Sequence, residues 1–331
     1  MPTSPASSNG SDWRPTASLE TLRLRARLLE RTRTFFAARG VLEVETPQLS
    51  AAAAVDLHLE SLIAQPADGG PAGWLHTSPE FPMKRLLAAG AGDIWQLARV
   101  FRGSERGRRH NPEFSLLEWY RVGWGADRLM GEVDEFVRTL AGEGGMAAET
   151  ARLSYREAFL RHAGFDPFAA SVAEMADVLA ARGVPLPEEV GGHRDAALDL
   201  ALATLVEPAL DPATPTFIYD FPASHAALAL IRAGDPPVAE RFELFLGGME
   251  LANGFHELTD ADEQAARFHA DLAARRARGL AEPPVDERLL AALRHGLPAC
   301  AGVALGFDRL VMILAGAKHI DEVLAFPAAR A

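Results

Sequence analysis

Apolar side chains recur at helical spacing over Leu19–Arg39, and Gly40 follows as a stop signal. The residues on this stripe are Leu22, Ala26, Leu29 and Phe36. Over Val41–Glu45 the pattern changes to alternating apolar and acidic residues, which is typical of a strand. Pro47 lacks the N–H that a central strand needs, so the strand is expected to end before it. This opening pattern predicts a long helix followed by a short strand.

Two β-rich runs, Ile94–Arg102 and Glu113–Arg121, bracket a charged loop and predict an antiparallel pair of strands. Period-two alternation places one set from each strand on a common face. The two sets are Gln96, Ala98, Val100 and Arg102, and Phe114, Leu116, Glu118 and Tyr120. Burying the polar groups of Arg102, Glu118 and Tyr120 without hydrogen-bonding or charged partners costs free energy. The face is therefore either solvated or part of a functional site, and the hairpin alone leaves both possibilities open.

The stretch 126–207 is rich in alanine and has the apolar spacing of amphipathic helices. Helices are expected at 126–141, 153–163, 172–182 and 193–206. No pattern here indicates catalysis, so we expect a mainly helical insertion that packs outside the sheet. Strand character then returns over Thr216–Phe221.

A second hairpin is predicted around Gly247–Gly248, because two glycines form a favourable two-residue turn between Phe242–Leu246 and Met249–Ala252. The turn pairs residue 245 with 250 and residue 243 with 252. Glu243 and Glu250 then lie diagonally on one face, with Cα atoms about 7–8 Å apart. Two such carboxylates either hold a nucleotide-bound magnesium ion or stand exposed to solvent.

Asn253 has the parity of the core face of this strand, so either a bulge turns its side chain or the predicted register fails there. Farther along, Asp260 and Glu263 form a capping-box pattern for a helix that runs to Arg278.

A strand over Ala301–Gly306 is expected to pass directly into a helix over Phe307–Leu314. Arg309 lies in the first turn of that helix. The helix dipole disfavours a cation there, so the position of Arg309 indicates an anion nearby, either a side chain or a phosphate.

The chain has 331 residues, 48% of them hydrophobic and 24% charged, which excludes disorder of the whole. Its formal net charge of -12 argues against a broad basic surface for nucleic acid. One cysteine, Cys300, excludes an intramolecular disulfide and suits a reducing compartment. No run approaches the roughly 20 apolar residues of a membrane helix. We therefore expect a cytoplasmic protein without membrane association, with a flexible leader over residues 1–17 and one folded domain over residues 18–331.

In order, these segments resemble the three signature segments of class II aminoacyl-tRNA synthetases, and within that class the lysyl branch. The first is the long helix and strand up to Pro47, the second is Phe101–Tyr120, and the third is Gly302–Arg309. Between them, Glu250–Gly254 and Glu257–Leu258 resemble the lysine-specific stretch. The resemblance implies an α+β fold with an antiparallel sheet flanked by helices, and a homodimer formed through the first segment.

Lysyl-tRNA synthetases carry an anticodon-binding barrel before the first segment, whereas here that helix begins near residue 19. The chain is therefore most similar to the stand-alone paralogues that attach (R)-β-lysine to a lysine of elongation factor P. Leu75–Arg85, His110–Phe114 and Val323–Pro327 carry this similarity. It implies an AMP-forming ligase that uses ATP and Mg²⁺, that takes α-lysine more weakly than (R)-β-lysine, and that does not use tRNA.

The resemblance also implies roles for individual residues. Arg102 and Arg309 would be catalytic, on the α- and γ-phosphates of ATP, and Glu243 and Glu250 would bind magnesium. Further nucleotide contacts are expected from Gly103, Ser104, Glu105, Asn111, Glu250, Leu251, Gly302 and Gly306. The amino acid would contact Ser78, Pro79, Glu80, Glu118, Tyr120, Glu257 and Ala304.

Two positions depart from the family pattern. The acidic residue after Arg102 is delayed by one position to Glu105, so the adenine contact falls to Ser104, to Glu105 or to the backbone. Ala304 stands where lysyl-tRNA synthetases have glycine, and its methyl group is expected to disfavour α-lysine relative to β-lysine. The role of His110, either a phosphate contact or a loop-ordering contact, stays open.

Three alternatives to the elongation factor P ligase are compatible with the residues. They are a minimal lysyl-tRNA synthetase, an enzyme that acylates a small amine or lipid, and a regulator that binds lysine without catalysis. The presence of Arg102, Arg309, Glu243 and Glu250 together disfavours the last.

Overall fold

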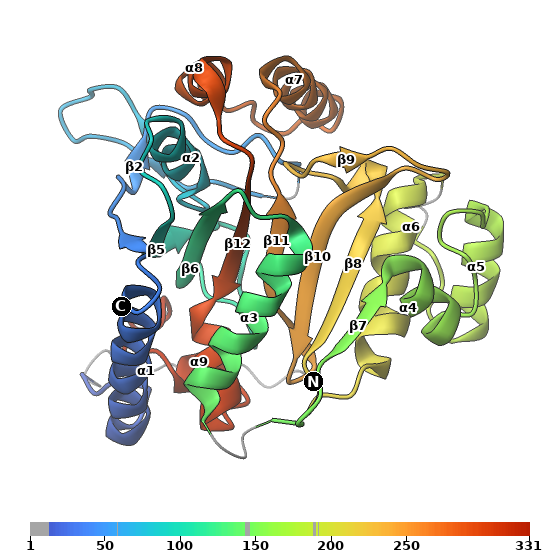
Figure 1. Cartoon of the computed structure of the whole chain (residues 1–331), viewed down its shortest axis with the longest axis horizontal. Helices are drawn as coiled ribbons and strands as arrows, with labels where there is room; N and C mark the ends of the chain where they lie inside the picture. Colours follow the sequence, from blue (N-terminus) through green and yellow to red (C-terminus); the bar gives the residue numbers. More distant parts are fainter. Residues whose placement is uncertain (1–12, 58, 143–145, 188–189, 191) are drawn as a thin grey trace, which may run out of the picture.

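The computed structural model describes residues 13–57, 59–142, 146–187, 190 and 192–331. A nine-stranded, mostly antiparallel sheet runs through its centre in the order β1-β5-β6-β12-β11-β10-β8-β7, and β9 pairs with β10 (Figure 1). Helices flank the sheet on both sides, which confirms the predicted fold class. A separate small sheet has the order β2-β4-β3.

The predicted long helix, both hairpins and the last strand and helix are all present. The helices are α1 (Leu19–Ala37), α2 (Glu80–Ala88), α3 (Ala126–Ala141), α4 (Tyr155–His162), α5 (Val172–Ala181), α6 (Arg194–Ala201), α7 (Ala261–Ala277), α8 (Glu287–Gly296) and α9 (Phe307–Ala315). The strands of the large sheet are β1 (Leu42–Glu43), β5 (Ile94–Phe101), β6 (Glu113–Val122), β7 (Ala151–Ser154), β8 (Thr216–Pro222), β9 (Ile231–Arg232), β10 (Val238–Leu246), β11 (Met249–His256) and β12 (Cys300–Gly306). Those of the small sheet are β2 (Leu49–Ser50), β3 (Ile63–Ala64) and β4 (Gly73–Leu75).

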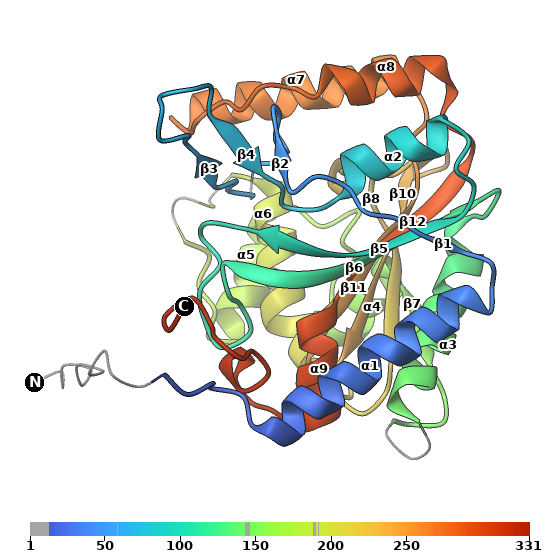
Figure 2. The same ribbon diagram turned by 90° about the vertical axis from the view of Figure 1, so that its left-hand side faces the viewer.

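The largest core lies between the sheet and three helices, α1, α3 and α9. In Figure 2 these helices lie below the sheet, and α7 and α8 lie above it. Phe36 of α1 stacks on Trp95 of β5 with ring centroids 4.9 Å apart, and Phe136 of α3 packs against both Phe36 and Trp119 of β6. Burial of these aromatic rings fixes the long first helix against the two strands of the first hairpin.

The predicted insertion outside the sheet is only partly correct. Ala151–Ser154 forms β7, which pairs in parallel with β8 at the sheet edge, and α3 covers the sheet as part of the main core. Helices α4, α5 and α6 form a second core with β8 and Phe245 of β10. A strand of four residues is too short to show an alternating pattern in the sequence. Its last residue, Ser154, is also the N-cap of the following helix, which favoured a helical interpretation.

On the opposite side, α2 and α8 pack together and α7 lies beside α8. Their apolar residues, which include Met83 and Leu293, meet Tyr120 of β6 and Cys300 of β12. Residues of α2 and α7 line a cavity together with residues of β6, β11 and β12.

The second hairpin has the predicted turn but not the predicted register throughout. Gly247 and Gly248 both have positive φ, at 65° and 70°, and residue 245 pairs with 250 as expected. Leu251 is then an extra residue, so Glu243 pairs with Asn253 and not with residue 252. The bulge that was one of two expectations for Asn253 is therefore confirmed.

The start of the chain is anchored earlier than predicted. The N–H groups of Thr16 and Ala17 donate to the carbonyls of Ala325 and Leu324, and Ala17 is buried. The order of the remaining leader, residues 1–12, lies outside the described residues. Ser18 caps α1 by accepting a hydrogen bond from the N–H of Thr21.

Candidate active site

A cavity of about 1630 Å³ is lined by residues of the first hairpin, the second hairpin and α2. It brings together most of the predicted site residues, although they are spread over more than two hundred positions. Those that line it are Ser78, Glu80, Arg102, Glu105, Asn111, Glu118, Tyr120, Glu243, Glu250, Leu251, Glu257, Gly302, Ala304, Gly306 and Arg309. Pro79, Gly103 and Ser104 do not line it.

Arg102 follows β5 and lies at one end of the cavity. Its Nη1 donates to Glu105 Oε1 at 3.0 Å, and its guanidinium carbon lies 5.1 Å from the centroid of the Phe114 ring on β6. Neither contact uses all five donors of the side chain. Ser104 is exposed, and Gly103 donates its N–H to the carbonyl of Glu60. Of the three adenine contacts considered, Glu105 is the side chain that faces the cavity.

Arg309, in the first turn of α9, is held by two partners. Its Nη1 donates to the carbonyl of Glu250 at 2.8 Å, and its Nη2 lies 2.7 Å from Nε2 of His110. His110 must accept in this pair, which requires a neutral ring. Burial and the charge of Arg309 lower the pKa of His110, in agreement with that role. The sequence position of Arg309 indicated an anion nearby, and the carboxylate of Glu250 lies 3.7 Å from its Nη1.

Asn111 lines the cavity, but both ends of its amide are engaged by backbone. Its Nδ2 donates to the carbonyl of Glu113 at 2.6 Å, and its Oδ1 accepts from the N–H of Ala328 at 3.0 Å. The N–H of Ile320 also donates to the carbonyl of Arg108. The C-terminal segment therefore holds the charged loop of the first hairpin in place, and Asn111 anchors that loop.

Glu243 and Glu250 face the same cavity from β10 and β11. Burial raises the pKa of Glu243 to about 7, against the opposing charge of Arg241, whose Nη2 lies 2.5 Å from Glu243 Oε1. Among the described residues no group of three or more His, Cys, Asp or Glu side chains is arranged to hold a metal ion. Two carboxylates fit Mg²⁺ only when ligand oxygens complete the coordination, as phosphates do.

A second acidic group lies at the other end of the cavity. Glu118 of β6 is 2% exposed and accepts from the hydroxyls of Ser78 and Tyr120, each at 2.6 Å. Burial and the nearby charge of Glu80 raise the pKa of Glu118 to about 8. A buried acid of this kind binds a proton or a cationic ligand at neutral pH.

Glu257 and Glu80 complete this group, and a buried lysine joins them. Lys84 Nζ lies 2.6 Å from Glu257 Oε2 and 2.7 Å from Glu80 Oε1. Burial raises the pKa of Glu257 to about 7, although Lys84 opposes the rise. The sequence reasoning missed Lys84. Two features of the sequence could have indicated the ion pair with Glu80. Lys84 follows Glu80 by four residues, the spacing of a helical ion pair, and the chain has only one other lysine.

Gly302 forms the floor between these carboxylates. A Cβ at this position would lie 2.3 Å from the Tyr120 ring and 2.5 Å from Glu257 Oε1. It therefore borders the carboxylates that line the cavity, and its expected contact with the nucleotide stays a prediction. Ala304 lies two residues farther along β12, opposite Glu118 of β6 and Asn253 of β11.

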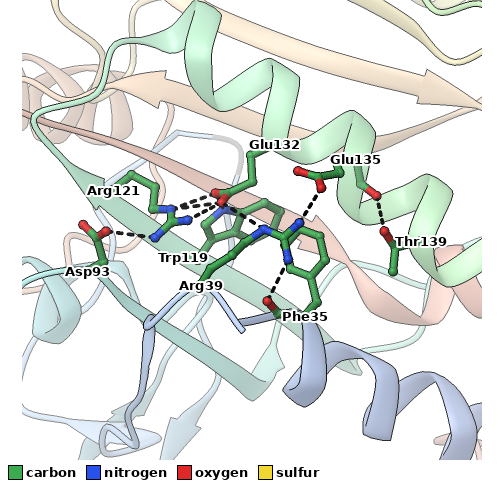
Figure 3. Close-up of polar contacts among 8 residues, drawn as sticks. All are labelled: Phe35, Arg39, Asp93, Trp119, Arg121, Glu132, Glu135 and Thr139. Atoms are coloured by element: carbon green, nitrogen blue, oxygen red, sulfur yellow. Dashed lines mark hydrogen bonds and ion pairs between the residues drawn. The ribbon is translucent and has the colours of Figure 1, made fainter. Parts of the chain in front are cut away.

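The strand that carries Glu118 and Tyr120 is fixed from behind by a polar network (Figure 3). The guanidinium of Arg121 pairs with Glu132 of α3 and with Asp93, the latter at 2.8 Å. The indole of Trp119 donates to Glu132 at 3.0 Å. Buried carboxylates need such partners. Alternate residues of β6 thus have different roles. Glu118 and Tyr120 line the cavity on one face, and Trp119 and Arg121 hold the strand against α3 on the other.

A family profile described as tRNA synthetases class II (D, K and N) matches residues 7–330. Curated relatives named elongation factor P–(R)-β-lysine ligase match over almost the whole chain. The protein of Vibrio vulnificus is 50% identical over 321 residues, which are 96% of this chain and 98% of the relative. Those of Yersinia enterocolitica and Proteus mirabilis are each 47% identical, over 98% and 97% of this chain and 100% and 99% of their own.

The chain belongs to the class II tRNA synthetase family, in the elongation factor P–(R)-β-lysine ligase branch. It is an amino-acid ligase enzyme, as the resemblance of its three segments implied. Two arginines and three carboxylates line one cavity, which suits such a ligase, because phosphates and amino groups carry opposite charges.

Proposed function

We propose that this chain activates (R)-β-lysine with ATP as an aminoacyl adenylate and transfers the acyl group to a lysine side chain of elongation factor P. One observation carries the proposal: Arg102 and Arg309 share a single cavity with Glu80, Glu118 and Glu257. The names of the relatives supply the acyl donor and the acceptor protein.

In the first step, an oxygen of the β-lysine carboxylate attacks the α-phosphorus, the bond to the bridging oxygen breaks, and pyrophosphate leaves. Negative charge on the reacting phosphate is stabilised by the guanidinium of Arg102. Arg309 binds the terminal phosphate, held in place by His110 and the Glu250 carbonyl. Glu243 and Glu250 would hold Mg²⁺, which neutralises phosphate charge when bound.

The diamino acid is oriented by the acidic end of the cavity. Glu118 and Glu257, each 2% exposed, are more deeply buried than Glu80, so they take the ammonium group far from the reacting carboxylate. Glu80 is more exposed than these two residues. It follows closely after Thr77, whose carbonyl accepts a hydrogen bond from Arg102. Glu80 therefore takes the amino group that is nearer the carboxylate of the substrate. Fixing both ends of the substrate places its carboxylate against the α-phosphate.

In the second step, the neutral amine of the acceptor lysine attacks the acyl carbon of the adenylate. The bond from that carbon to the phosphate oxygen breaks, AMP leaves, and the amine loses a proton to form an amide. The reaction needs no nucleophile from this chain.

We further propose a homodimer that works in the cytoplasm without tRNA. Apolar side chains exposed on α1, β1 and the small sheet support the dimer, namely Leu19, Leu42, Leu49 and Ile63. The net charge of -12 gives no support for binding a polyanion. Among the described residues no helix is long and apolar enough to cross a membrane.

Mass spectrometry of elongation factor P after incubation with this chain, ATP and (R)-β-lysine tests the proposal. A mass increase of one β-lysyl group on one lysine is expected, together with (R)-β-lysine-dependent pyrophosphate exchange into ATP. Charging of tRNA without modification of elongation factor P would show instead a minimal lysyl-tRNA synthetase. Light scattering of the purified chain tests the dimer.

A further inference from the structure

Lys84 is a buried cation that no step of the proposed reaction uses. It lies on α2 one turn after Glu80, and its side chain is 2% exposed. Its Nζ reaches one oxygen of Glu80 and one oxygen of Glu257, at 2.7 and 2.6 Å. These carboxylates raise the pKa of Lys84 although burial acts to lower it, so the ammonium stays charged.

Each partner of Lys84 keeps a second oxygen for another contact. Glu257 Oε2 faces Lys84, whereas Oε1 lies over Gly302, where even one added carbon would approach it to 2.5 Å. Tyr120 packs on the same glycine. Lys84 therefore turns Glu257 so that its free oxygen is presented at the floor of the acidic end.

The charges at this end can be counted. The titratable groups that face Lys84 and its partners are Glu80, Glu257, Glu118, Tyr120 and Cys300. Burial raises the pKa of the Tyr120 hydroxyl well above its ordinary value and that of the Cys300 thiol to about 12, so both are neutral. A bound cationic ligand favours the ionised forms of the three carboxylates. In that state the three carboxylates and the one ammonium carry a net charge of two minus, which a ligand with two positive charges balances.

We propose that Lys84 is a positioning residue that makes this pocket selective for a ligand with two ammonium groups. It fixes the free oxygens of Glu80 and Glu257 and keeps the charge of the pocket equal and opposite to that of a diammonium compound. The inference rests on the proposed function for the identity of the substrate, but not for the charge selectivity itself.

Replacing Lys84 by methionine keeps the length of the side chain and removes the charge. Lys84 lowers the pKa of Glu257, so in Lys84→Met that pKa rises and Glu257 is protonated at neutral pH. A protonated carboxyl group no longer attracts an ammonium group. The loss should therefore be greater for a diammonium ligand than for a monoammonium ligand, and alkaline pH should reduce it.

Calorimetric binding of two probes tests this without turnover. The probes are (R)-β-lysine and 3-aminohexanoic acid, which lacks the distal amino group. We expect the wild-type chain to prefer (R)-β-lysine, and Lys84→Met to reduce that preference about tenfold for each unit by which the pKa of Glu257 rises. The preference should recover as the pH is raised. Lys318→Met, at the exposed second lysine, should bind both probes as the wild type does.

Removing Lys84 alone leaves the buried carboxylate of Glu257 and the partly buried carboxylate of Glu80 without their cation, which destabilises the fold. The double variant Lys84→Met/Glu80→Gln restores the charge count and should fold and recover part of the preference for (R)-β-lysine. Equal weakening of both probes in Lys84→Met, with no dependence on pH and no recovery in the double variant, would overturn the inference. Failure of the wild type in pyrophosphate exchange would instead count against the proposed function, since probe binding does not require it.

Discussion

A carboxylate oxygen of Asp308 accepts a hydrogen bond from Arg25 at 2.5 Å, which ties α1 to the first turn of α9. The other oxygen accepts from the N–H of Ser115 on β6 at 2.8 Å, and Arg25 also donates to the Ser115 hydroxyl at 2.7 Å. Asp308 immediately precedes Arg309. One ion pair therefore joins the proposed dimer helix, a strand of the site and the helix that carries a catalytic arginine.

Removing the cation of this pair should weaken both the fold and the catalytic step. Asp308 is 2% exposed, so Arg25→Met leaves a buried carboxylate without its partner and should lower the free energy of unfolding by about 3 kcal/mol. Urea denaturation measures this, and pyrophosphate exchange should fall as well because Arg309 loses its support. The matched control on α1 is Arg33→Met, whose pair with Glu43 is exposed and should contribute less than about 1 kcal/mol. Equal losses in the two variants would contradict the prediction.

Two glycines of β12 should report on different ends of the cavity. A Cβ at Gly302 would lie 2.3 Å from the Tyr120 ring, so Gly302→Ala should displace Tyr120 and Glu257 and raise the KM for (R)-β-lysine at least tenfold. At Gly306 the nearest atom to an added Cβ is Arg309 Cδ at 3.4 Å, and Gly306→Ala should change the KM for ATP instead. Steady-state pyrophosphate exchange separates the two constants. If Gly302→Ala changed only the KM for ATP, the result would contradict this prediction and would indicate that Gly302 contacts the nucleotide.

Ala304 is expected to discriminate between the two lysine isomers. Its methyl group projects beside Glu118 and Asn253, so Ala304→Gly should enlarge the pocket and improve the use of α-lysine relative to (R)-β-lysine by about tenfold. The ratio of kcat/KM for the two amino acids in pyrophosphate exchange measures the effect. Equal efficiency of the wild-type chain with both isomers would remove the hypothesis.

The pKa of Glu118 predicts how stability depends on pH. Burial raises that pKa to about 8, so between the pKa of the unfolded chain and this pH the folded chain holds a proton that the unfolded chain has released. The resulting stabilisation is complete below the unfolded pKa and is lost as the pH rises towards 8. When the pH is raised from weakly acidic to alkaline values, the thermal stability of Glu118→Gln should therefore fall by less than that of the wild type. If the unfolding temperatures of the two proteins changed by equal amounts with pH, the result would contradict this prediction.

Glu118→Gln should also change the binding of the diamino acid. Two ammonium groups favour the ionised form of Glu118, so the wild type should release a proton on binding (R)-β-lysine at neutral pH. Calorimetry in buffers of different ionisation enthalpy measures that release. The glutamine variant should release less and bind more weakly.

Sequence reasoning succeeded where local geometry is repetitive or fixed by one residue. Strands β5 and β6 were placed because their alternation runs over many residues, and the turn at Gly247–Gly248 fixed the first pairs of its hairpin. It failed where one extra residue changes the register. Leu251 forms a bulge that alternation alone does not locate, so Glu243 faces Asn253.

The helical pattern also concealed short elements and single contacts. Strand β7 has four residues and joins the sheet through β8, which lies more than sixty positions away. The hydrogen bond that the Asn111 amide oxygen accepts from the N–H of Ala328, near the C-terminal end, was not predicted, and the nucleotide contact of Asn111 stays a prediction. Such partners are distant in sequence, and no local pattern encodes them.

The sequence by itself determined the long first helix, the two hairpins, the last strand and helix, and the identity of the charged residues that a class II ligase requires. It did so because side-chain periodicity, turn residues and segment spacing act over short distances along the chain. Only the tertiary structure decided that Lys84 lies between Glu80 and Glu257, and that Gly302 lies against Tyr120 and Glu257. Their charges interact because folding buries them together, where low polarity strengthens every ion pair and raises the free-energy cost of each unpaired group.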